Sequence, residues 1–220
     1  MKNYVVTALE AQKNTKKRYN LYLDGEFRCV LTEETVFFHG VKVGQTYTEE
    51  ELQRIFNSME VEIALNKSLN LLSKSMKTSK QIRDYLTEKG FDKCVIKVVL
   101  DKLEKYGYVN DSEYVKAYIA QNKQTKGKYR IREELILKGV SQQLIEYALS
   151  CLDEDEAFNV AFCLANKFVK DKPLDQKMLV RLNRHLLSRG FDFSIVHSVI
   201  SQLKNNRSEY EESVDLDFDV

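Results

Sequence analysis

The sequence predicts a mainly α-helical protein, in which a small antiparallel β module precedes three tandem three-helix repeats in an elongated curved array. Two observations predict this fold. A glycine-containing triplet occurs three times at nearly equal spacing inside the same apolar frame, whereas the segment before residue 48 carries a hairpin signal. A single proline, Pro173, among 220 residues also suits a long run of helices.

The three triplets are Gly90-Phe91-Asp92, Gly139-Val140-Ser141 and Gly190-Phe191-Asp192, whose glycines lie 49 and 51 residues apart. The apolar positions that recur around them are Ile82, Leu86, Ile96, Leu100 and Leu103, then Ile131, Leu135, Ile145, Leu149 and Leu152, then Leu182, Leu186, Val196, Ile200 and Leu203. We expect each glycine to end a helix in the left-handed conformation, and the next residue to pack against the preceding leucine. The third residue should then cap the following helix with its side chain.

Residues 1–48 are expected to form the β module. Asp24-Gly25 is the preferred centre of a type I′ turn and lies between two apolar-rich segments, which predicts a β-hairpin. The predicted strands are Tyr19–Leu23 and Glu26–Leu31 around this turn, with Tyr4–Ala11 and Thr35–His39 as further strands.

From Thr48 onward the apolar period becomes helical, and Thr78 with Gln81 fits a capping box. The predicted helices lie near 49–74, 79–89 and 92–106, near 111–124, 128–138 and 141–152, and near 154–170, 175–189 and 192–205. These helices define repeats at 49–107, 108–152 and 153–205. Residues 206–220 lack periodicity and are expected to form an acidic tail.

The net charge of +1 hides an uneven distribution. Residues 205–220 carry a net charge of −5, which leaves +6 on the rest of the chain. Six basic residues lie within 121–140 and seven within 165–191. Such clusters suit a polyanionic or acidic partner, although they are also typical of an ordinary solvated helix face. One hypothesis is that the tail folds over a basic surface and competes with the partner.

Groups that could catalyse a reaction or bind a metal are few. His185 and His197 lie on different predicted helices, and His39 is far away in the sequence, so we interpret all three as packed or surface histidines. The sequence contains no glycine-rich phosphate loop. We therefore expect a protein without enzymatic activity, cofactor or metal.

The sequence also predicts a cytoplasmic protein. No apolar stretch approaches the ~20 residues that span a bilayer, and the polar amino terminus is unlike a signal peptide. The four cysteines, Cys29, Cys94, Cys151 and Cys163, have no paired spacing and are expected to be reduced thiols.

Two helices joined by a short glycine turn are also typical of helix-turn-helix DNA-binding units. Such a unit needs a second helix that contacts bases and phosphates. In the middle repeat this helix, Ser141–Leu149, contains no lysine or arginine, so groove reading is disfavoured. Contacts between the preceding helices and the nucleic-acid backbone remain open.

Five segments carry a resemblance to a known family, namely Leu86–Phe91, Leu103–Asp111, Tyr114–Ile119, Lys126-Gly127 and Ile131–Val140. In these segments the chain resembles the RecX family, regulators of the RecA recombinase. It covers the repeat region from about 65 to 205, and the β module looks like the extension of RecX proteins from Gram-positive bacteria. One departure is Lys74–Ser79, where the family usually has an arginine-containing stretch. Lysine binds phosphate or carboxylate as a point charge and arginine as a fork, which puts the contacts of the first repeat in doubt.

The resemblance implies a protein that lodges in the groove of the RecA–DNA filament and alters filament growth, and we expect it to be a monomer. It would thereby reduce ATP hydrolysis, strand exchange and co-protease activity in DNA repair, recombination and the SOS response. Contacts with DNA phosphates in or near the filament would be possible, and no membrane would be involved. Two alternatives are a protein that binds DNA directly without the recombinase and a helical scaffold for protein interactions.

The apolar stripes also predict a partner-facing surface. Ile131 and Leu135 should point inward, which leaves Arg130 and the acidic pair Glu133-Glu134 beside solvent. Leu182 and Leu186 should do the same in the third repeat. The candidate partner-binding or DNA-binding residues are Lys126, Lys128, Arg130, Arg132, Arg181, Arg184 and Arg189.

Overall fold

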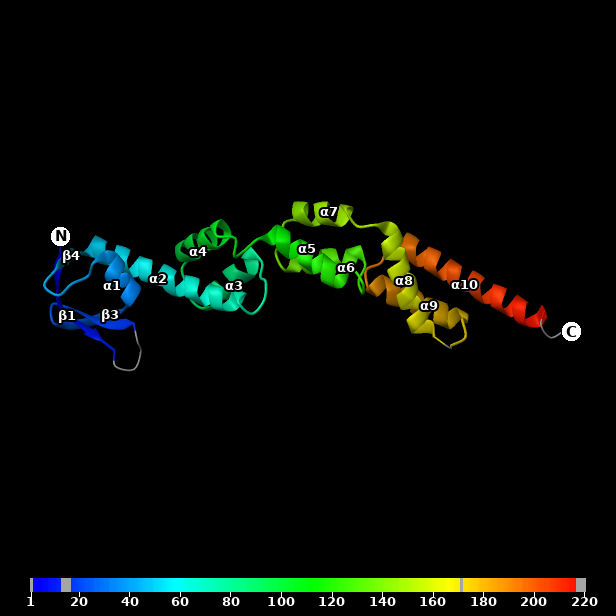
Figure 1. The fold of residues 1–220 in the computed structure, drawn as a ribbon, viewed down its shortest axis with the longest axis horizontal. Coiled ribbons are helices and arrows are strands. Elements are labelled where there is room, and N and C mark those ends of the chain that lie inside the picture. Colours follow the sequence, from blue (N-terminus) through cyan, green and yellow to red (C-terminus); the bar gives the residue numbers. More distant parts are fainter. Residues whose placement is uncertain (1, 13–16, 171, 217–220) are drawn as a thin grey trace. The chain divides into compact units, whose positions relative to one another are not determined.

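The computed structural model describes residues 2–12, 17–170 and 172–216. Helices make up most of the described chain, and a small sheet lies near the amino terminus (Figure 1). The chain divides into two compact units. The first contains the residues up to Met76 together with Ile82–Val109, and the second contains Lys77–Gln81 together with the residues from Asn110 onward.

The sheet of the first unit is antiparallel and has the strand order β3-β2-β1-β4. Its strands are β1 (Asn3–Ala11), β2 (Arg18–Leu23), β3 (Glu26–Thr32) and β4 (Thr46–Thr48). Asp24 and Gly25, with φ of 51° and 88°, form the turn between β2 and β3, as the type I′ prediction requires. The predicted hairpin and first strand are confirmed, while the three-residue strand β4 was not expected.

The predicted strand at Thr35–His39 is wrong, because these residues belong to helix α1 (Glu33–His39). Thr32 caps this helix by accepting a hydrogen bond of 3.1 Å from the backbone N–H of Thr35. Acidic residues in the first turn favour the helix further, and Gly40 ends it with a φ of 61°. These capping signals outweigh the β propensity of a short valine- and phenylalanine-containing segment.

The 24-residue helix α2 (Glu49–Leu72) contributes to two cores in the first unit. Its first turns place Leu52 and Ile55 among the buried side chains of the β module. Its later turns place Ala64 in the core of the first helical repeat. The same repeat contains α3 (Ser79–Glu88) and α4 (Lys93–Lys105).

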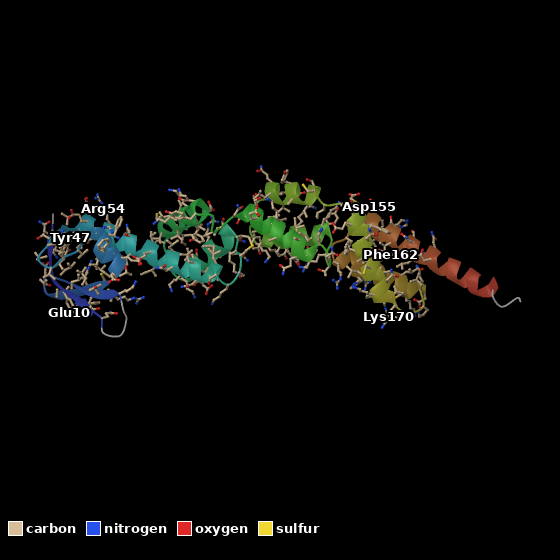
Figure 2. All side chains as sticks on the ribbon, in the orientation of Figure 1. Glu10, Tyr47, Arg54, Asp155, Phe162 and Lys170 are labelled. Atoms are coloured by element: carbon tan, nitrogen blue, oxygen red, sulfur yellow. The ribbon has the colours of Figure 1, made fainter. Side chains whose placement is uncertain are left out.

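The second unit contains the other two helical repeats, each with its own core. Their helices are α5 (Asp111–Asn122), α6 (Lys128–Leu137), α7 (Gln142–Ser150), α8 (Glu154–Val169), α9 (Gln176–Ser188) and α10 (Phe193–Leu216). Phe162, labelled in Figure 2, stacks on Phe158 at 6.0 Å between ring centroids and packs against the core of the third repeat.

Helix α10 continues to Leu216, so the predicted helix end near residue 205 is wrong. No proline or glycine, the strongest helix-breaking residues, follows residue 190. Residues 206–216 of the expected tail are therefore helical, and 217–220 lie outside the described residues.

The three glycine triplets end helices as predicted. Gly90, Gly139 and Gly190 have φ between 82° and 83°. The residue after each glycine donates a backbone hydrogen bond of 3.2–3.3 Å to the carbonyl of the leucine four positions before that glycine. Side-chain capping by the third residue is confirmed for Ser141 and Asp192. It is wrong for Asp92, whose carboxylate makes no capping hydrogen bond.

Candidate partner-binding surface

The glycine turns also join successive repeats within the second unit. The backbone N–H of Gly127 donates 2.9 Å to the carbonyl of Arg189, and that of Tyr129 donates 3.1 Å to the carbonyl of Gly190. A Cβ on Gly127 would lie 2.2 Å from the Gly190 carbonyl oxygen, so a side chain at position 127 would collide with backbone. This close approach determines where α6 begins. It therefore also determines the positions of the candidate cations in the first turns of α6.

A similar joint involves residues 77–81 of the same unit. The hydroxyl of Thr78 donates a 2.6 Å hydrogen bond to the carbonyl of Lys138, and the side chain of Lys80 covers Gly139. Thr78 also forms the predicted capping box with Gln81, at 3.1 and 3.2 Å. Residues 77–81 therefore contact the glycine turn at 139 as the start of α6 contacts the glycine turn at 190.

Glu134 lies at the centre of a polar cluster on α6. Its carboxylate accepts hydrogen bonds from Lys126 Nζ at 2.6 Å and Arg130 Nε at 3.0 Å. The phenol of Tyr118 donates a further, very short hydrogen bond to it. The Nζ atoms of Lys126 and Lys138 also lie 5.8 and 5.4 Å from the centre of the Tyr118 ring. Two of the predicted partner-facing cations are therefore neutralised inside the repeat.

The electrostatics of this cluster follow from burial and hydrogen bonding. The side chain of Glu134 is only 17% exposed, so the prediction that it flanks solvent is wrong. Burial raises the pKa of Glu134, but hydrogen bonds from Lys126, Tyr118 and Arg130 outweigh this and leave the pKa below its usual value. Burial and the hydrogen bond to Glu134 raise the pKa of Tyr118. The cluster therefore contains an ionised carboxylate and a neutral phenol at neutral pH.

Two further candidate cations form ion pairs with neighbouring helices. Lys128 Nζ lies 3.5 Å from the carboxylate of Glu154 on α8. Arg132 Nη2 lies 2.7 Å from the carboxylate of Glu146 on α7. Each pair connects two helices, and each gives its cation a counter-charge within the unit.

Arg189 also has a structural role at the joint. Its Nε donates 3.2 Å to Nε2 of His185, and its Nη1 donates 3.2 Å to the carbonyl of Thr125. His185 stacks on Phe168 with ring centroids 4.4 Å apart. Burial and the nearby Arg189 cation lower the pKa of His185, so its imidazole accepts this hydrogen bond in its neutral form.

Arg181 and Arg184 differ from the other candidates. Both are exposed on α9, together with Lys177 one turn earlier. Across the described ranges 2–12, 17–170 and 172–216, none of the three forms an ion pair or a side-chain hydrogen bond. The exposed apolar side chains of Val180 and Leu187 lie on the same helix. We call this set of five residues the α9 face.

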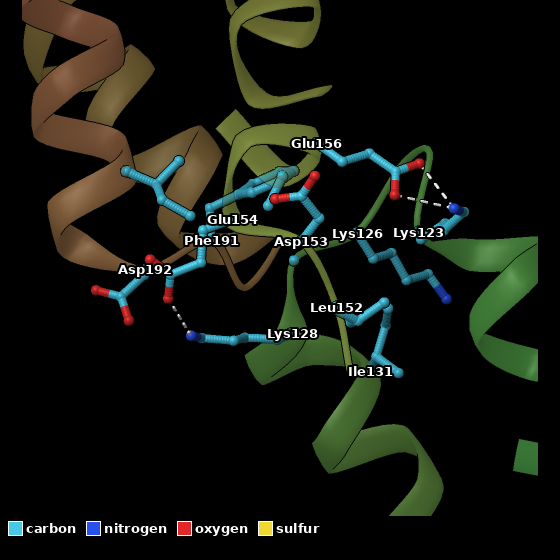
Figure 3. A pocket seen from close by; sticks show the side chains of 13 residues that line it. Lys123, Lys126, Lys128, Ile131, Leu152, Asp153, Glu154, Glu156, Phe191 and Asp192 are labelled. Carbon is cyan, nitrogen blue, oxygen red and sulfur yellow. Dashed lines mark hydrogen bonds and ion pairs between the residues drawn. The ribbon is translucent and has the colours of Figure 1, made fainter. Parts of the chain in front are cut away.

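A small cavity of about 40 Å³ lies beside the joint between α6 and the Gly190 turn (Figure 3). Ile131 and Phe191 line it, and at its rim Lys123 Nζ lies 2.7 Å from the carboxylate of Glu156. Ligand pockets usually enclose about 300 Å³ or more, so this cavity fits a few water molecules at most.

The structure therefore separates the seven candidates into two groups. Lys126, Lys128, Arg130, Arg132 and Arg189 have internal partners, whereas Arg181 and Arg184 have none in the described part of the chain. The carboxylate partners that we missed are Glu134, Glu146 and Glu154. The spacing of four residues between Arg130 and Glu134 was a usable signal, because such pairs meet on a helix surface.

Other kinds of site find no support in the described residues. Among them, no group of three or more histidine, cysteine, aspartate or glutamate side chains is placed to hold a metal ion. No helix that the structure describes is long and apolar enough to cross a membrane.

Three family models match the chain. Residues 4–47 match the regulatory protein RecX N-terminal domain, 64–103 the first RecX three-helix domain, and 110–149 the second. The regulatory protein RecX of Clostridium perfringens (strain SM101 / Type A) is 34% identical over 205 residues, which cover 91% of this chain and 97% of the relative. The regulatory protein RecX of Clostridioides difficile (strain 630) is also 34% identical, over 91% of this chain and 96% of the relative.

Solved structures agree with these matches. A crystal structure of regulatory protein RecX superimposes with a TM-score of 0.70 and 26% identity, covering 90% of this chain and 99% of that chain. RecX from Lactobacillus salivarius shares the fold with a TM-score of 0.60 and 24% identity over 66% of this chain. The β module, the helical repeats and these matches together show that the chain belongs to the RecX family of regulatory proteins.

Proposed function

We propose that this chain regulates the RecA recombinase by binding the RecA–DNA filament, and that it inhibits recombinase, ATPase and co-protease activity without catalysing a reaction. The observation that carries the proposal is the match to RecX regulatory proteins over nearly their whole length. The fold supports it, since helical repeats bind partners along extended surfaces without a catalytic pocket.

The α9 face is the part of the second unit that best fits contact with the filament or its DNA. Its three cations have no internal counter-charge in the described structure, so they are available to an acidic or polyanionic surface. Val180 and Leu187 add exposed apolar area beside them, and interfaces commonly combine apolar contacts with arginine. The cations of α6 are less available, because a partner would first have to displace Glu134, Glu146 or Glu154.

The test is a titration of the chain against RecA filaments on single-stranded DNA, against bare single-stranded DNA and against RecA alone, with DNA-dependent ATPase activity as readout. The variant Arg181→Glu/Arg184→Glu should inhibit several-fold less while melting like the parent, because exposed charges contribute ~0–1 kcal/mol to folding. Lys102→Glu/Lys105→Glu on α4 is the matched control, since it reverses two exposed cations of another helix.

The outcomes separate the alternatives. Equal loss of inhibition in both variants would show a general charge effect and contradict a role for the α9 face. Tight, salt-sensitive binding to bare DNA with no preference for the filament would favour the direct DNA-binding alternative. Binding to none of the three would leave the scaffold alternative and contradict the proposed function.

A further inference from the structure

A groove between α3 and α4 in the first repeat is lined by three cations that have no carboxylate partner within the described residues. It has a volume of about 530 Å³, and Ile96 and Leu100 line it. Arg83 on α3 and Lys93 and Lys97 on α4 also line it. All three cations are exposed, and within the described residues none forms an ion pair or a side-chain hydrogen bond. We call it the α3–α4 groove.

The second repeat provides an internal reference for this groove. Arg83 lies seven residues before its glycine and Lys97 seven residues after it. The equivalent residues of the second repeat are Arg132 and Glu146, whose side chains form a 2.7 Å ion pair between α6 and α7. In the second repeat the arginine thus holds a carboxylate from the facing helix, and in the first repeat a second cation replaces that carboxylate.

The third repeat places neutral side chains at the same two positions, Asn183 and His197. Only the first repeat therefore has like charges there. Two cations that line one groove repel each other, and an anion between them is stabilised by both. We propose that the α3–α4 groove binds an acidic protein segment, and that a carboxylate of this segment lies between Arg83 and Lys97 and pairs with Arg83 as Glu146 pairs with Arg132 in the second repeat.

The rest of the groove favours a protein segment over nucleic acid. Asp101 and Glu104 line the part of the groove near the carboxyl end of α4, so the charge changes sign along its length. A phosphodiester backbone is negative throughout and would be repelled there. A peptide can place an acidic side chain beside Lys97, an apolar side chain over Leu100, and neutral or basic groups near Asp101.

The probe for this proposal is a fluorescent 16-residue peptide with the sequence of residues 205–220. It contains six acidic side chains interspersed with apolar residues such as Val214 and Leu216. The variant Lys97→Glu in the full chain should form the ion pair of the second repeat with Arg83 and close the groove. We expect it to weaken peptide binding by about tenfold or more, since it removes one charge-assisted contact and adds a repulsion.

Three controls make the result decisive. Lys102→Glu, an exposed reversal on α4 that does not line the groove, should change binding about twofold or less, because the charge is screened. A peptide with its acids replaced by amides should not bind. The variant Lys97→Glu/Glu146→Lys has the parent's net charge but moves the paired cations to the α6–α7 position, so peptide binding should return there.

Several results would overturn the proposal. Equal effects of Lys97→Glu and Lys102→Glu would show nonspecific attraction, and no recovery in the double variant would contradict the comparison between repeats. A loss of thymidine-oligonucleotide binding in Lys97→Glu that exceeds the loss of peptide binding would assign the groove to nucleic acid. The proposal does not depend on RecA, so it can fail while the proposed function stands.

Discussion

Helices α6 and α9 occupy the same position in consecutive repeats and both carry several cations, yet only α9 presents them free of internal partners. Helix α6 contains Glu133 and Glu134, and it packs near Glu146 of α7 and Glu154 of α8. Helix α9 contains no acidic residue at all. The comparison teaches that the charge of a helix face depends on the carboxylates that surround it, and counting basic residues along the sequence does not reveal this.

The largest effect is expected from a substitution that disrupts the contact between the start of α6 and the Gly190 turn, on which the position of α6 depends. In Gly190→Val, the new Cβ would lie 2.2 Å from the backbone nitrogen of Arg130, and the residue would also be strained by a φ of 82°. We expect a loss of roughly 3 kcal/mol or more in the stability of the second unit, because neither backbone can move away cheaply.

The matched control is Gly90→Val, where nothing lies within 4 Å of the new Cβ and only the positive φ is costly. It should lose about 1–2 kcal/mol. Denaturant unfolding monitored by circular dichroism compares the two variants. Equal losses would mean that backbone strain alone, and not the contact with α6, determines the cost.

A less severe substitution should make α6 resemble α9 in having cations that are more available to a partner. In Glu134→Gln, Lys126 loses its carboxylate partner and Arg130 keeps only the exposed Glu133, at 3.6 Å, so both become more available to a polyanion. We expect several-fold tighter binding to DNA or to the filament, and a loss of about 1–3 kcal/mol in stability from the broken hydrogen bonds. Anisotropy titrations at fixed salt measure the first effect, and unchanged affinity would show that Glu134 does not mask these cations.

The stability of the same variant should also depend on pH differently from that of the parent. The pKa of Glu134 is lower in the folded protein than its usual value of 4.5, so its ionisation stabilises the fold above that pH. This contribution is lost as the pH falls through the lowered pKa. Stability measured between pH 6 and ~3 should therefore fall less steeply in Glu134→Gln than in the parent. Parallel curves would contradict the role of the cluster.

The smallest expected effect concerns the acidic end of the chain. Deleting residues 206–220 removes a net charge of −5 and should tighten binding to polyanions, by about two- to threefold at low salt and less at physiological ionic strength. Titrations at two salt concentrations measure this. If the deletion has no effect at low salt, the acidic segment does not compete for the basic surfaces.

The repeat architecture was predictable because its signals are local. A glycine in the left-handed conformation and apolar residues at fixed offsets specify helix ends and core faces together, so every predicted repeat helix exists. One error occurred where capping competed with another signal, because Thr32 and Gly40 determine the helix α1 in spite of its β-forming residues. A second occurred where the sequence contains no glycine or proline to end a helix, so that α10 continues past 205.

The candidate surface was less predictable, because it depends on contacts between helices. The pairing of Arg132 with Glu146 joins two helices, and no sequence spacing within one helix reveals it. The joint between Gly127 and Gly190 likewise depends on the approach of two backbones that are distant in sequence. The family resemblance predicted a partner, but it did not distinguish available cations from neutralised ones.

Helix α2 belongs to the core of the β module and to that of the first helical repeat, and this makes the boundary near residue 48 a poor place to divide the chain. A shortened protein beginning at residue 49 would keep the helix but expose Leu52 and Ile55, which are 2% and 3% exposed in the intact chain. Such apolar patches favour aggregation. The β module and the first repeat should consequently unfold as one cooperative block, and a protease should cut between them only after both have opened.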